Sequence, residues 1–529
     1  MTSICVEQGL TGFLSTDLVL VNGNVITLNP AQPKADWIAI GNGKIVALGS
    51  RDNIQAPVAE NTKIIDCQGR TILPGFIDSH FHLVSFAESH VVLNLNPRHG
   101  FRSISEIQKA LRAICKERPS GEWIRAKGFD EFFLEEKRYL NRWDLDKVTL
   151  LHPIKITHRS GHLHILNSLA LRKLGVSKET PDPPGGLIDR DLETGEPTGL
   201  LYEMGEFLSN RIPPIEAKVL EDAVEKASKQ LLSLGITSLQ DASARNDHKR
   251  WNLLKTWKKK GILHPRINMM LGAVNLSEYS AYDFEANSSL NQLRLNCVKI
   301  VLDETTGLLH PEQSKLNELV REIHNSGLQV AIHAIEEKAV ESACAAIEYA
   351  LEKKPRLDHR HRIEHCAVCP PSLAKRIASL GIRVVTHPSF VYYSGDRYLE
   401  NVRRPQLRYL YPLKTLIQHG VIVAGSSDCP ISPPNPLVGL YGAVSRMSET
   451  GKSVVPSERI PIIEALQMYT IYAADVSFEE KTKGSIAPGK LADLVVLNED
   501  PTQLAPKELR NLQVEMTILD GEIVWRKKS

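Results

Sequence analysis

Apolar residues follow one spacing near the two ends of the chain and another spacing in its middle. Residues 17–49 contain short runs of apolar, β-branched residues separated by turn pairs such as Asn22-Gly23. Asn-Gly pairs between such runs are typical of β-hairpins. Residues 492–525 repeat this pattern around the turn pair Asp520-Gly521. Because isolated short strands are only marginally stable, we expect both ends to form one small β-domain.

From residue 219 onward a different unit recurs, made of an amphipathic helix, a glycine, an apolar strand and a polar residue. The glycines that end these helices are Gly235, Gly327, Gly381 and Gly420. Glycine is the residue expected where a helix turns into a strand. The strands that follow lead to Asp241, His333, His387 and Asp428. Repeated helix–strand units with apolar strands predict a parallel sheet, and at this length a (β/α)8 barrel fits best.

A doubly wound open sheet is the alternative, but the chain contains no G-x-G-x-x-G or P-loop motif. We therefore predict the α/β class: a distorted (β/α)8 TIM-like barrel with a small β-sandwich domain formed by both chain termini. The predicted sandwich comprises residues 1–72 and 485–529, and the predicted barrel comprises residues 73–484. Residues from about 84 to 215 carry many turn signals and are predicted to be a large insertion.

Composition and charge narrow the classes of partner and of cellular location that we expect for the protein. The 529 residues include 64 Lys+Arg and 62 Asp+Glu, a formal charge of +2, which indicates neither a nucleic-acid nor a membrane partner. Eight scattered cysteines argue against a disulfide scaffold. The first basic residue is Lys34, so a cationic signal region is missing, and no apolar run approaches the ~20 residues of a membrane span. We expect a soluble cytoplasmic protein that acts on a small molecule, with a homodimer left open.

Histidines at the ends of apolar strands are candidate metal ligands. His80 and His82 are two positions apart and therefore face the same side of a strand. His333, His365 and Asp428 end later predicted strands. Imidazole and carboxylate are common zinc ligands. Each histidine alone is more often a structural residue, but their joint order along a barrel-like chain favours one shared metal centre.

Two further positions bear on this centre. Lys299 lies inside an apolar strand, where a lysine must snorkel, pair with an anion or be modified. Glu364 is expected to point away from His365 by strand alternation and to pair with Arg362.

A single C-x-x-C pair, Cys366 and Cys369, follows directly. It cannot complete a four-cysteine zinc site and lacks the helix start of a redox motif, so we expect two buried thiols.

The chain resembles the amidohydrolase superfamily, in the type 3 branch that includes N-substituted formamide deformylase. The similarity covers nearly the whole chain and includes the segments Asp17–Thr27, Pro74–His82, Asn167–Leu171, Arg362–His365 and Gly484–Leu494. It implies a metal-dependent hydrolase with one or two divalent ions, preferably Zn²⁺. The implied ligands are His80, His82, Lys299, His333, His365 and Asp428. In many relatives the lysine carries a carbamate that bridges two metals, and the aspartate also handles the proton.

The chain departs from its relatives at positions that are expected to face substrate. Relatives often have Gln-Pro where this chain has His387-Pro388, so the specificity of the deformylase is not transferred. Weaker candidates for substrate contacts are His162, Asn167, Glu203 and His387. Asn167 could equally be a helix N-cap, and His387 could instead orient a neighbouring group.

The predicted reaction is hydrolysis of a C–N bond in an amide, N-substituted formamide or related small molecule. Metal lowers the pKa of water to about 7, and the metal-bound hydroxide attacks the carbonyl carbon. Asp428 accepts the water proton and passes it to the leaving amine. Hydroxide attack does not specify the leaving group, so hydrolysis of another carbonyl, C–O or C–Cl bond stays open. A non-catalytic, ligand-binding regulatory relative is also open, although the complete ligand set disfavours it.

Overall fold

The computed structural model describes residues 16–51, 61–183, 185–282, 284, 292–304 and 308–528. The chain divides into two compact units. The first unit comprises Met1–Leu83, Ser228–Asp303 and Pro311–Ser529, and the second comprises Val84–Ala227 and Glu304–His310. The predicted insertion at about 84 to 215 falls inside the second unit, whereas the predicted barrel and sandwich fall together in the first.

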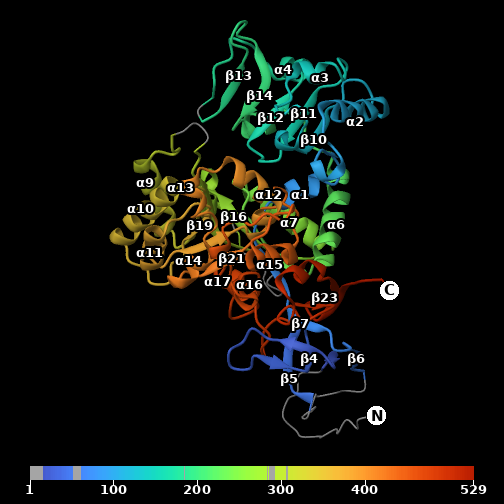
Figure 1. The fold of residues 1–529 in the computed structure, drawn as a ribbon, viewed down its shortest axis with the longest axis vertical. Helices are drawn as coiled ribbons and strands as arrows, with labels where there is room; N and C mark the ends of the chain where they lie inside the picture. The colour runs from blue at the N-terminus through green and yellow to red at the C-terminus, as the bar shows by residue number, and fades with distance from the viewer. Residues whose placement is uncertain are drawn as a thin grey trace. The chain divides into compact units, whose positions relative to one another are not determined.

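Eight parallel strands form the barrel of the first unit, as the sequence predicts (Figure 1). They are β8 (Phe76–Phe81), β15 (Ile236–Asp241), β16 (Arg266–Gly272), β17 (Leu293–Val301), β18 (Gln329–Ala334), β19 (Arg362–His365), β20 (Arg383–Thr386) and β21 (Val423–Gly425). Each strand pairs with the next, so the sheet runs from β8 to β21. A parallel bridge between Phe81 and Cys429 then links the last strand's end to the first. The barrel is therefore nearly closed, with the strand ends gathered at one rim.

Helices follow most barrel strands and cover them. The helices of this unit are α7 (His248–Lys259), α8 (Leu276–Ala281), α9 (Gln313–Asn325), α10 (Glu337–Lys353), α11 (Pro371–Ser379), α12 (Pro388–Asn401), α13 (Arg404–Leu407), α14 (Leu413–Gln418), α15 (Pro436–Ser445), α16 (Ile462–Met468) and α17 (Ile471–Asp475). Gly327 and Gly381 follow α9 and α11 with φ of 81° and 68°. That left-handed conformation is readily available to glycine, which explains the helix–glycine–strand pattern of the sequence.

Both chain ends build the two sheets of the β-sandwich. One sheet is ordered β5-β4-β1-β6 and the other β24-β23-β22-β7-β2-β3. Their strands are β1 (Leu18–Val21), β2 (Asn24–Ile26), β3 (Lys34–Ala35), β4 (Trp37–Gly41), β5 (Lys44–Gly49), β6 (Lys63–Asp66), β7 (Thr71–Pro74), β22 (Leu494–Leu497), β23 (Val514–Leu519) and β24 (Glu522–Arg526). Leu20 and Ile40 from the first sheet share one apolar core with Leu494 and Ile518 from the second. The predicted sandwich from both termini is thus confirmed.

The second unit contains a sheet of its own, ordered β13-β14-β12-β11-β10-β9. Its strands are β9 (Leu93–Asn94), β10 (Ile124–Phe129), β11 (Ile154–His158), β12 (Leu163–Leu166), β13 (Leu187–Arg190) and β14 (Pro197–Tyr202). Its helices are α2 (Ile104–Glu117), α3 (Arg142–Asp146), α4 (Ser168–Leu174) and α5 (Gly205–Ser209), while α1 (Leu83–Glu88) and α6 (Ala217–Ser233) cross the unit boundaries. Apolar residues of α2, β10, β11 and β12 form a core within this unit.

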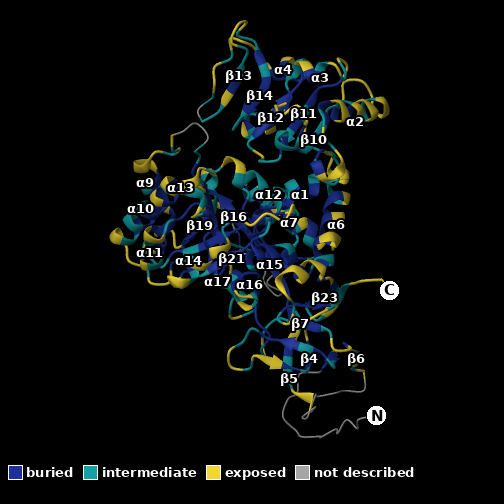
Figure 2. Cartoon of the chain, viewed as in Figure 1, coloured by how far each residue is buried: buried dark blue, intermediate teal, exposed yellow. Residues whose placement is uncertain are grey.

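The barrel strands β8, β15 and β16 are buried along their whole length, whereas sandwich strands such as β6 and the outward helix faces are exposed (Figure 2). Cys366 and Cys369 are buried free thiols, as predicted. Across the described residues, no helix combines the length and the apolarity that crossing a bilayer requires.

Candidate metal centre

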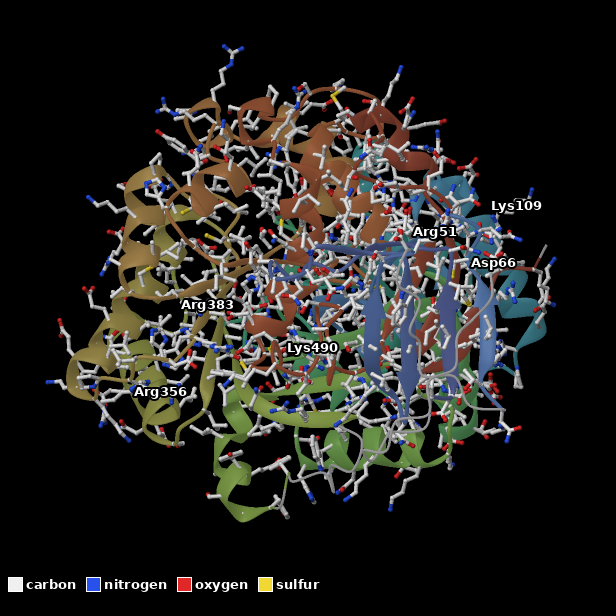
Figure 3. The ribbon with its side chains drawn as sticks, turned by 90° about the horizontal axis from the view of Figure 1, so that it is seen from below. Arg51, Asp66, Lys109, Arg356, Arg383 and Lys490 are labelled. Carbon is white, nitrogen blue, oxygen red and sulfur yellow. The ribbon has the colours of Figure 1, made fainter. Side chains whose placement is uncertain are left out.

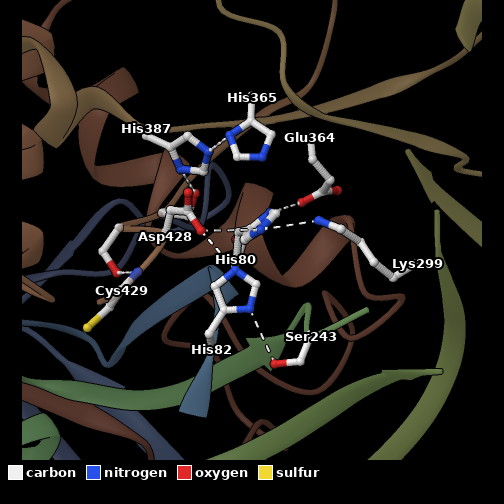
Figure 4. A network of polar contacts seen from close by, with 12 residues as sticks. His80, His82, Ser243, Lys299, Glu364, His365, His387, Asp428 and Cys429 are labelled. Atoms are coloured by element: carbon white, nitrogen blue, oxygen red, sulfur yellow. Dashed lines mark hydrogen bonds and ion pairs between the residues drawn. The ribbon is translucent and has the colours of Figure 1, made fainter. Parts of the chain in front are cut away.

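The rim of the barrel brings together side chains from three strand ends (Figure 4). His80 lies in β8 and His82 directly follows it, while His365 ends β19 and Asp428 follows β21. The ring centroid of His80 lies 5.3 Å from that of His82 and 5.0 Å from that of His365. Residues that are distant in the sequence therefore converge on one small volume, as the sequence predicts.

His80 sits at the centre of this volume and is almost completely buried. Its Nδ1 contacts the carboxylate of Glu364. Its Nε2 lies 3.2 Å from Lys299 Nζ and 3.5 Å from Asp428 Oδ1. The carboxylate of Glu364 accepts the Nδ1–H, so Nε2 is the nitrogen that faces the centre.

A backbone kink explains how Glu364 reaches this site. His365 has a φ of 70°, a left-handed conformation that is uncommon for residues other than glycine. The strand alternation that separates Glu364 from His365 ends at that point, and both side chains enter the cluster. The predicted pair of Glu364 with Arg362 is present, with Nε–Oε1 at 2.5 Å. The expectation that Glu364 points away from the site is wrong, because the strand ends in a left-handed residue.

His365 leaves one ring nitrogen uncovered. Its Nδ1 lies 2.7 Å from Nε2 of His387. The Nε2 atom of His365 is buried and has no hydrogen-bond partner among the described residues. A buried polar atom without a partner is costly, so native structures seldom retain one unless an ion or water completes it. This atom is the strongest sign of a missing ligand in the cluster.

The hydrogen bonds behind His365 fix which nitrogen carries the proton. The hydroxyl of Ser426 donates to the carbonyl oxygen of Thr386 at 3.0 Å. Since that uses its single hydrogen, His387 Nδ1–H must donate to Ser426 Oγ, 2.8 Å away. His387 Nε2 then accepts from His365 Nδ1–H. The uncovered Nε2 of His365 therefore carries a lone pair, which is the form of imidazole that binds a metal.

Burial sets the charges of the cluster. Desolvation, with neighbouring histidines and Lys299, lowers the pKa of His365 well below its ordinary value, and desolvation lowers that of His387 to about 4. Desolvation also lowers the pKa of Lys299 to about 8. Desolvation would raise the pKa of the Asp428 carboxyl, but the nearby imidazoles, first His80, hold it below its ordinary value. The cluster thus places the neutral imidazoles of His365 and His387 near the anionic carboxylate of Asp428.

Two overlapping groups of ligand atoms could hold an ion, each with its atoms within 4.8 Å of one another. One consists of His80, His82 and Asp428, and the other of His80, His365 and His387. Imidazole nitrogens with a carboxylate suit zinc or a similar divalent cation. In the first group, His82 Nε2 lies 3.0 Å from Asp428 Oδ1. Two ligands about 2 Å from a shared tetrahedral ion would be separated by roughly 3.3 Å, so the residues fit a metal.

The other predicted ligands lie nearby. Lys299 is buried in β17 and reaches His80 from the side opposite Asp428, as Figure 4 shows. His333, in β18, packs its ring against His365 with centroids 4.2 Å apart. His333 belongs to neither ligand group that the described residues form.

Of the four predicted substrate contacts, two are engaged in other roles. Asn167 is buried and caps α4, accepting from the backbone N–H of Ala170 at 3.0 Å and of Ile154 at 2.9 Å. Its amide nitrogen donates to the His152 carbonyl at 2.9 Å, so no polar atom is left for substrate and the substrate assignment is corrected to a helix cap. His387 is fully buried behind His365, which favours the orienting role.

The other two lie in the second unit and form a pair. His162 Nδ1 lies 2.9 Å from the Glu203 carboxylate. Glu203 has a φ of 53°, and such left-handed residues gather at functional sites. The His162 side chain keeps 44% of its surface exposed, so it could contact a ligand.

A third group in the second unit resembles a metal site by composition. Asp130, Glu131 and His158 place their ligand atoms within 4.8 Å. However, His158 Nδ1 accepts from the backbone N–H of Ser160 at 3.2 Å, and Nε2 donates to Glu131 at 2.8 Å. Both nitrogens of this histidine are satisfied by the protein, in contrast to His365.

Several residues around the centre were not predicted. Asp78 accepts from Ser427, through its hydroxyl at 2.5 Å and its backbone N–H at 3.1 Å, and so anchors the loop that carries Asp428. Burial raises the pKa of Asp78 to about 7. Ser243 contacts His82, and Ser426 contacts His387. Only Asp78 gave a signal in the sequence, as an acidic residue two positions before His80 in an otherwise apolar strand.

Comparison with family models matches residues 63–525 to the model described as amidohydrolase family. The putative amidohydrolase YtcJ of Bacillus subtilis (strain 168) is 29% identical, over 96% of this chain and 98% of that protein. The N-substituted formamide deformylase of Arthrobacter pascens is 28% identical, over 97% of this chain and 98% of that protein. Among solved structures, an uncharacterized metal-dependent hydrolase from Pyrococcus furiosus is 26% identical with a TM-score of 0.71, covering 92% of this chain and all of that one.

Proposed function

The chain belongs to the amidohydrolase family, and we propose that it is a metal-dependent hydrolase that cleaves a C–N bond in an amide, an N-substituted formamide or a related small molecule. One observation carries the metal dependence, namely the buried lone pair of His365 Nε2 beside an anionic Asp428. The match to the formamide deformylase supports the choice of bond.

The residues of the centre would have different roles in hydrolysis: some would hold the metal, one would transfer a proton, and others would orient the ligands. One or two divalent ions, preferably zinc, held by His80, His82, His365 and Asp428 would lower the pKa of water and polarise a carbonyl oxygen. Asp428 is ionised and faces the centre, so it can take the water proton and pass it to the leaving nitrogen. His387 and Glu364 hold the rings of His365 and His80 from behind. We include His333 as a further ligand from the resemblance.

Lys299 is proposed to carry a carbamate. Its lowered pKa of about 8 gives a neutral amine at moderately alkaline pH, the form that reacts with carbon dioxide. The nitrogen forms a bond to the carbon of CO₂ and loses a proton to solvent, which leaves an anionic carbamate. That change replaces a buried cation with an oxygen ligand next to His80. Mass spectrometry of the protein under bicarbonate tests it, with an added mass expected on Lys299.

Substrate specificity is proposed to involve the second unit. His162 and Glu203 form a partly exposed pair that could donate to or accept from a polar substrate group. Replacement of His162 should change KM more than kcat, because the pair contacts substrate and not the reacting water. A variant in which kcat falls while KM stays unchanged would contradict this assignment.

The test of the function compares the wild type with Asp428→Asn after zinc loading, on a panel of N-formyl and N-acyl amines. We expect turnover by the wild type and a loss of about 10³-fold or more in the variant, at folding similar to that of the wild type. Metal content is measured in both proteins, so that loss of metal is separated from loss of proton transfer. A fully loaded wild type that cleaves no substrate would favour the non-catalytic alternative.

A further inference from the structure

A second set of buried polar groups lies behind His82, on the side away from Asp428. Asp241, the last residue of β15, is fully buried. Its Oδ1 accepts from the hydroxyl of Ser243 at 2.6 Å and from the Ser243 backbone N–H at 3.0 Å. Ser243 Oγ in turn lies 3.2 Å from Nδ1 of His82. Figure 4 shows the last of these contacts below the ring of His82.

We propose that Asp241 is a positioning residue that acts through Ser243 to determine which ring nitrogen His82 presents to Asp428. The inference rests on the proposed metal centre, since it assigns His82 a metal to face. Asp241 ended a predicted strand in the sequence but had no predicted role, and it touches neither the metal ligands nor the reacting atoms directly.

The direction of each hydrogen bond follows from counting hydrogens. A serine hydroxyl has a single hydrogen, and here it points to Asp241. Ser243 Oγ can therefore only accept from His82, so Nδ1 of that ring must carry a hydrogen. The other nitrogen, Nε2, then faces Asp428 Oδ1 across 3.0 Å.

This arrangement makes the gap between His82 and Asp428 a cation site. A lone pair on Nε2 opposite an anionic carboxylate oxygen is repulsive unless a cation, a proton or a metal ion, lies between them. If Ser243 could donate to Nδ1 instead, His82 would carry its hydrogen on Nε2 and bond directly to Asp428. That hydrogen bond would compete with metal, and Asp241 prevents it by holding the serine hydrogen.

The two carboxylate oxygens of Asp241 differ in their contacts, and this difference predicts which substitutions keep the hydrogen bond to Ser243. Asp241 Oδ2 is buried and has no hydrogen-bond partner in the part of the chain that the structure describes. Asn246 adds its amide to Oδ1 at 3.3 Å. All donors thus converge on the one oxygen that faces Ser243, and an asparagine could place its carbonyl oxygen there and keep the relay.

The experiment measures zinc affinity of the full-length protein by competition with a chelator, in four variants. Ser243→Ala removes the relay and Asp241→Ala frees the serine hydrogen, so each should weaken zinc binding by about 10- to 100-fold, the usual range for such supporting partners. Ser243→Thr keeps the hydroxyl and Asp241→Asn keeps the acceptor, so each should retain affinity within a few-fold of the wild type.

A matched control separates this effect from the loss of any buried hydroxyl. Ser228 is fully buried, whereas Ser243 is half-buried, and the Ser228 hydroxyl accepts from the backbone N–H of His264 away from the centre. Ser228→Ala should leave zinc affinity unchanged. ¹⁵N NMR of labelled histidines adds a second readout on the metal-free protein, in which the wild type keeps a hydrogen on His82 Nδ1 and Ser243→Ala carries it on Nε2.

Three results separate the inference from the function on which it rests. Zinc binding that is as tight in Ser243→Ala and Asp241→Ala as in the wild type would overturn the role of Asp241 while leaving the hydrolase intact. Equal weakening by Ser243→Thr and Ser243→Ala would overturn it too, because the hydroxyl would not be the operative group. Failure of the wild type to bind zinc would overturn both.

Discussion

The first unit contains two H-x-H motifs, and the structure places them at opposite ends of the barrel strands, with different partners. His80 and His82 end β8 at the rim of the barrel, whereas His359 and His361 precede β19 at its other end. We call His80, His82, His333, His365 and His387 the rim cluster, and His324, His359 and His361 the basal cluster. Two arginines labelled in Figure 3 contact the basal cluster: the Arg356 guanidinium donates to the carbonyl oxygen of His324, and the Arg383 backbone N–H donates to that of His361.

Every ring nitrogen of the basal cluster has a protein partner. His361 Nδ1 accepts from the Val330 backbone at 3.0 Å, so its Nε2–H donates to His324 at 2.8 Å. His324 then donates to the carbonyl of Lys354 at 2.7 Å. His359 accepts from the His361 backbone at 2.9 Å and donates to a backbone carbonyl at 2.8 Å. Nothing in this cluster requires an ion.

Burial does not distinguish His361 of the basal cluster from His365 of the rim cluster, and neither does the direction of their pKa shifts. His361 and His365 are both almost fully buried, and desolvation lowers the pKa of both well below the ordinary value. Among the described residues, what differs is the buried Nε2 of His365, which has no hydrogen-bond partner, whereas each ring nitrogen of the basal cluster has one. The comparison teaches that a metal site is identified by unsatisfied donor atoms, not by a concentration of histidines.

The largest expected effect comes from removing the uncovered nitrogen. His365→Ala should reduce turnover of the zinc-loaded protein by about 10³-fold or more, because it deletes a proposed ligand. The fold should survive, since no protein group depends on that nitrogen. Steady-state kinetics and circular dichroism together check this outcome, and turnover within ten-fold of the wild type would remove His365 from the centre.

The matching change at the base should act on stability instead. His361→Ala deletes two buried hydrogen bonds and leaves a cavity, so the free energy of unfolding should fall by about 2–4 kcal/mol. Urea denaturation measures the loss, and activity per folded molecule should remain near that of the wild type. A loss of zinc affinity in this variant would contradict the separation of the two clusters.

The basal cluster should also make the protein sensitive to acid. The pKa values of His324, His359 and His361 are lowered in the folded state, chiefly by desolvation, so the unfolded chain binds protons first as pH falls. Their contribution to the free energy of unfolding is therefore complete above the unfolded pKa of about 6.5. As pH falls below that value, the free energy of unfolding decreases by up to about 1.4 kcal/mol per pH unit for each histidine. Unfolding of the metal-free protein between pH 7.5 and 5 measures this slope. His361→Asn should make it shallower, and an unchanged slope would exclude a basal contribution.

The smallest effect is expected in the second unit. His158→Asn removes the histidine of the satisfied group with Asp130 and Glu131, so zinc stoichiometry should not change. Elemental analysis of the loaded protein measures it. A loss of one zinc per chain would show that a histidine whose nitrogens are both hydrogen-bonded to protein can still belong to a metal site. An uncovered nitrogen would then no longer separate the rim cluster from the basal cluster.

The sequence predicted the architecture better than the details of the centre. The barrel followed from helix–glycine–strand units, and the convergence of His80, His82, His365 and Asp428 followed from their places at strand ends. Periodicity cannot reveal the left-handed turn at His365, and it therefore misplaced Glu364. Asn167 was ambiguous, because an asparagine before a helix signals a cap and a contact equally.

Other parts of the centre depend on contacts between distant strands. The pairs His82–Ser243 and His387–Ser426 join residues 161 and 39 positions apart, so no local pattern indicates them. The motif His359-Arg360-His361 carries the same spacing as His80-Phe81-His82. Two features distinguish the structural motif from the candidate ligand pair. One is whether the motif begins or ends its strand, and the other is which groups its ring nitrogens contact.

An anomalous-scattering map of zinc-loaded crystals tests the central claim most directly. The account predicts a peak at the rim, within bonding distance of His365 Nε2, His80 Nε2 and Asp428, and no peak beside His324, His359 or His361. A fully loaded protein whose zinc lies at the base, or elsewhere than the rim, would contradict it.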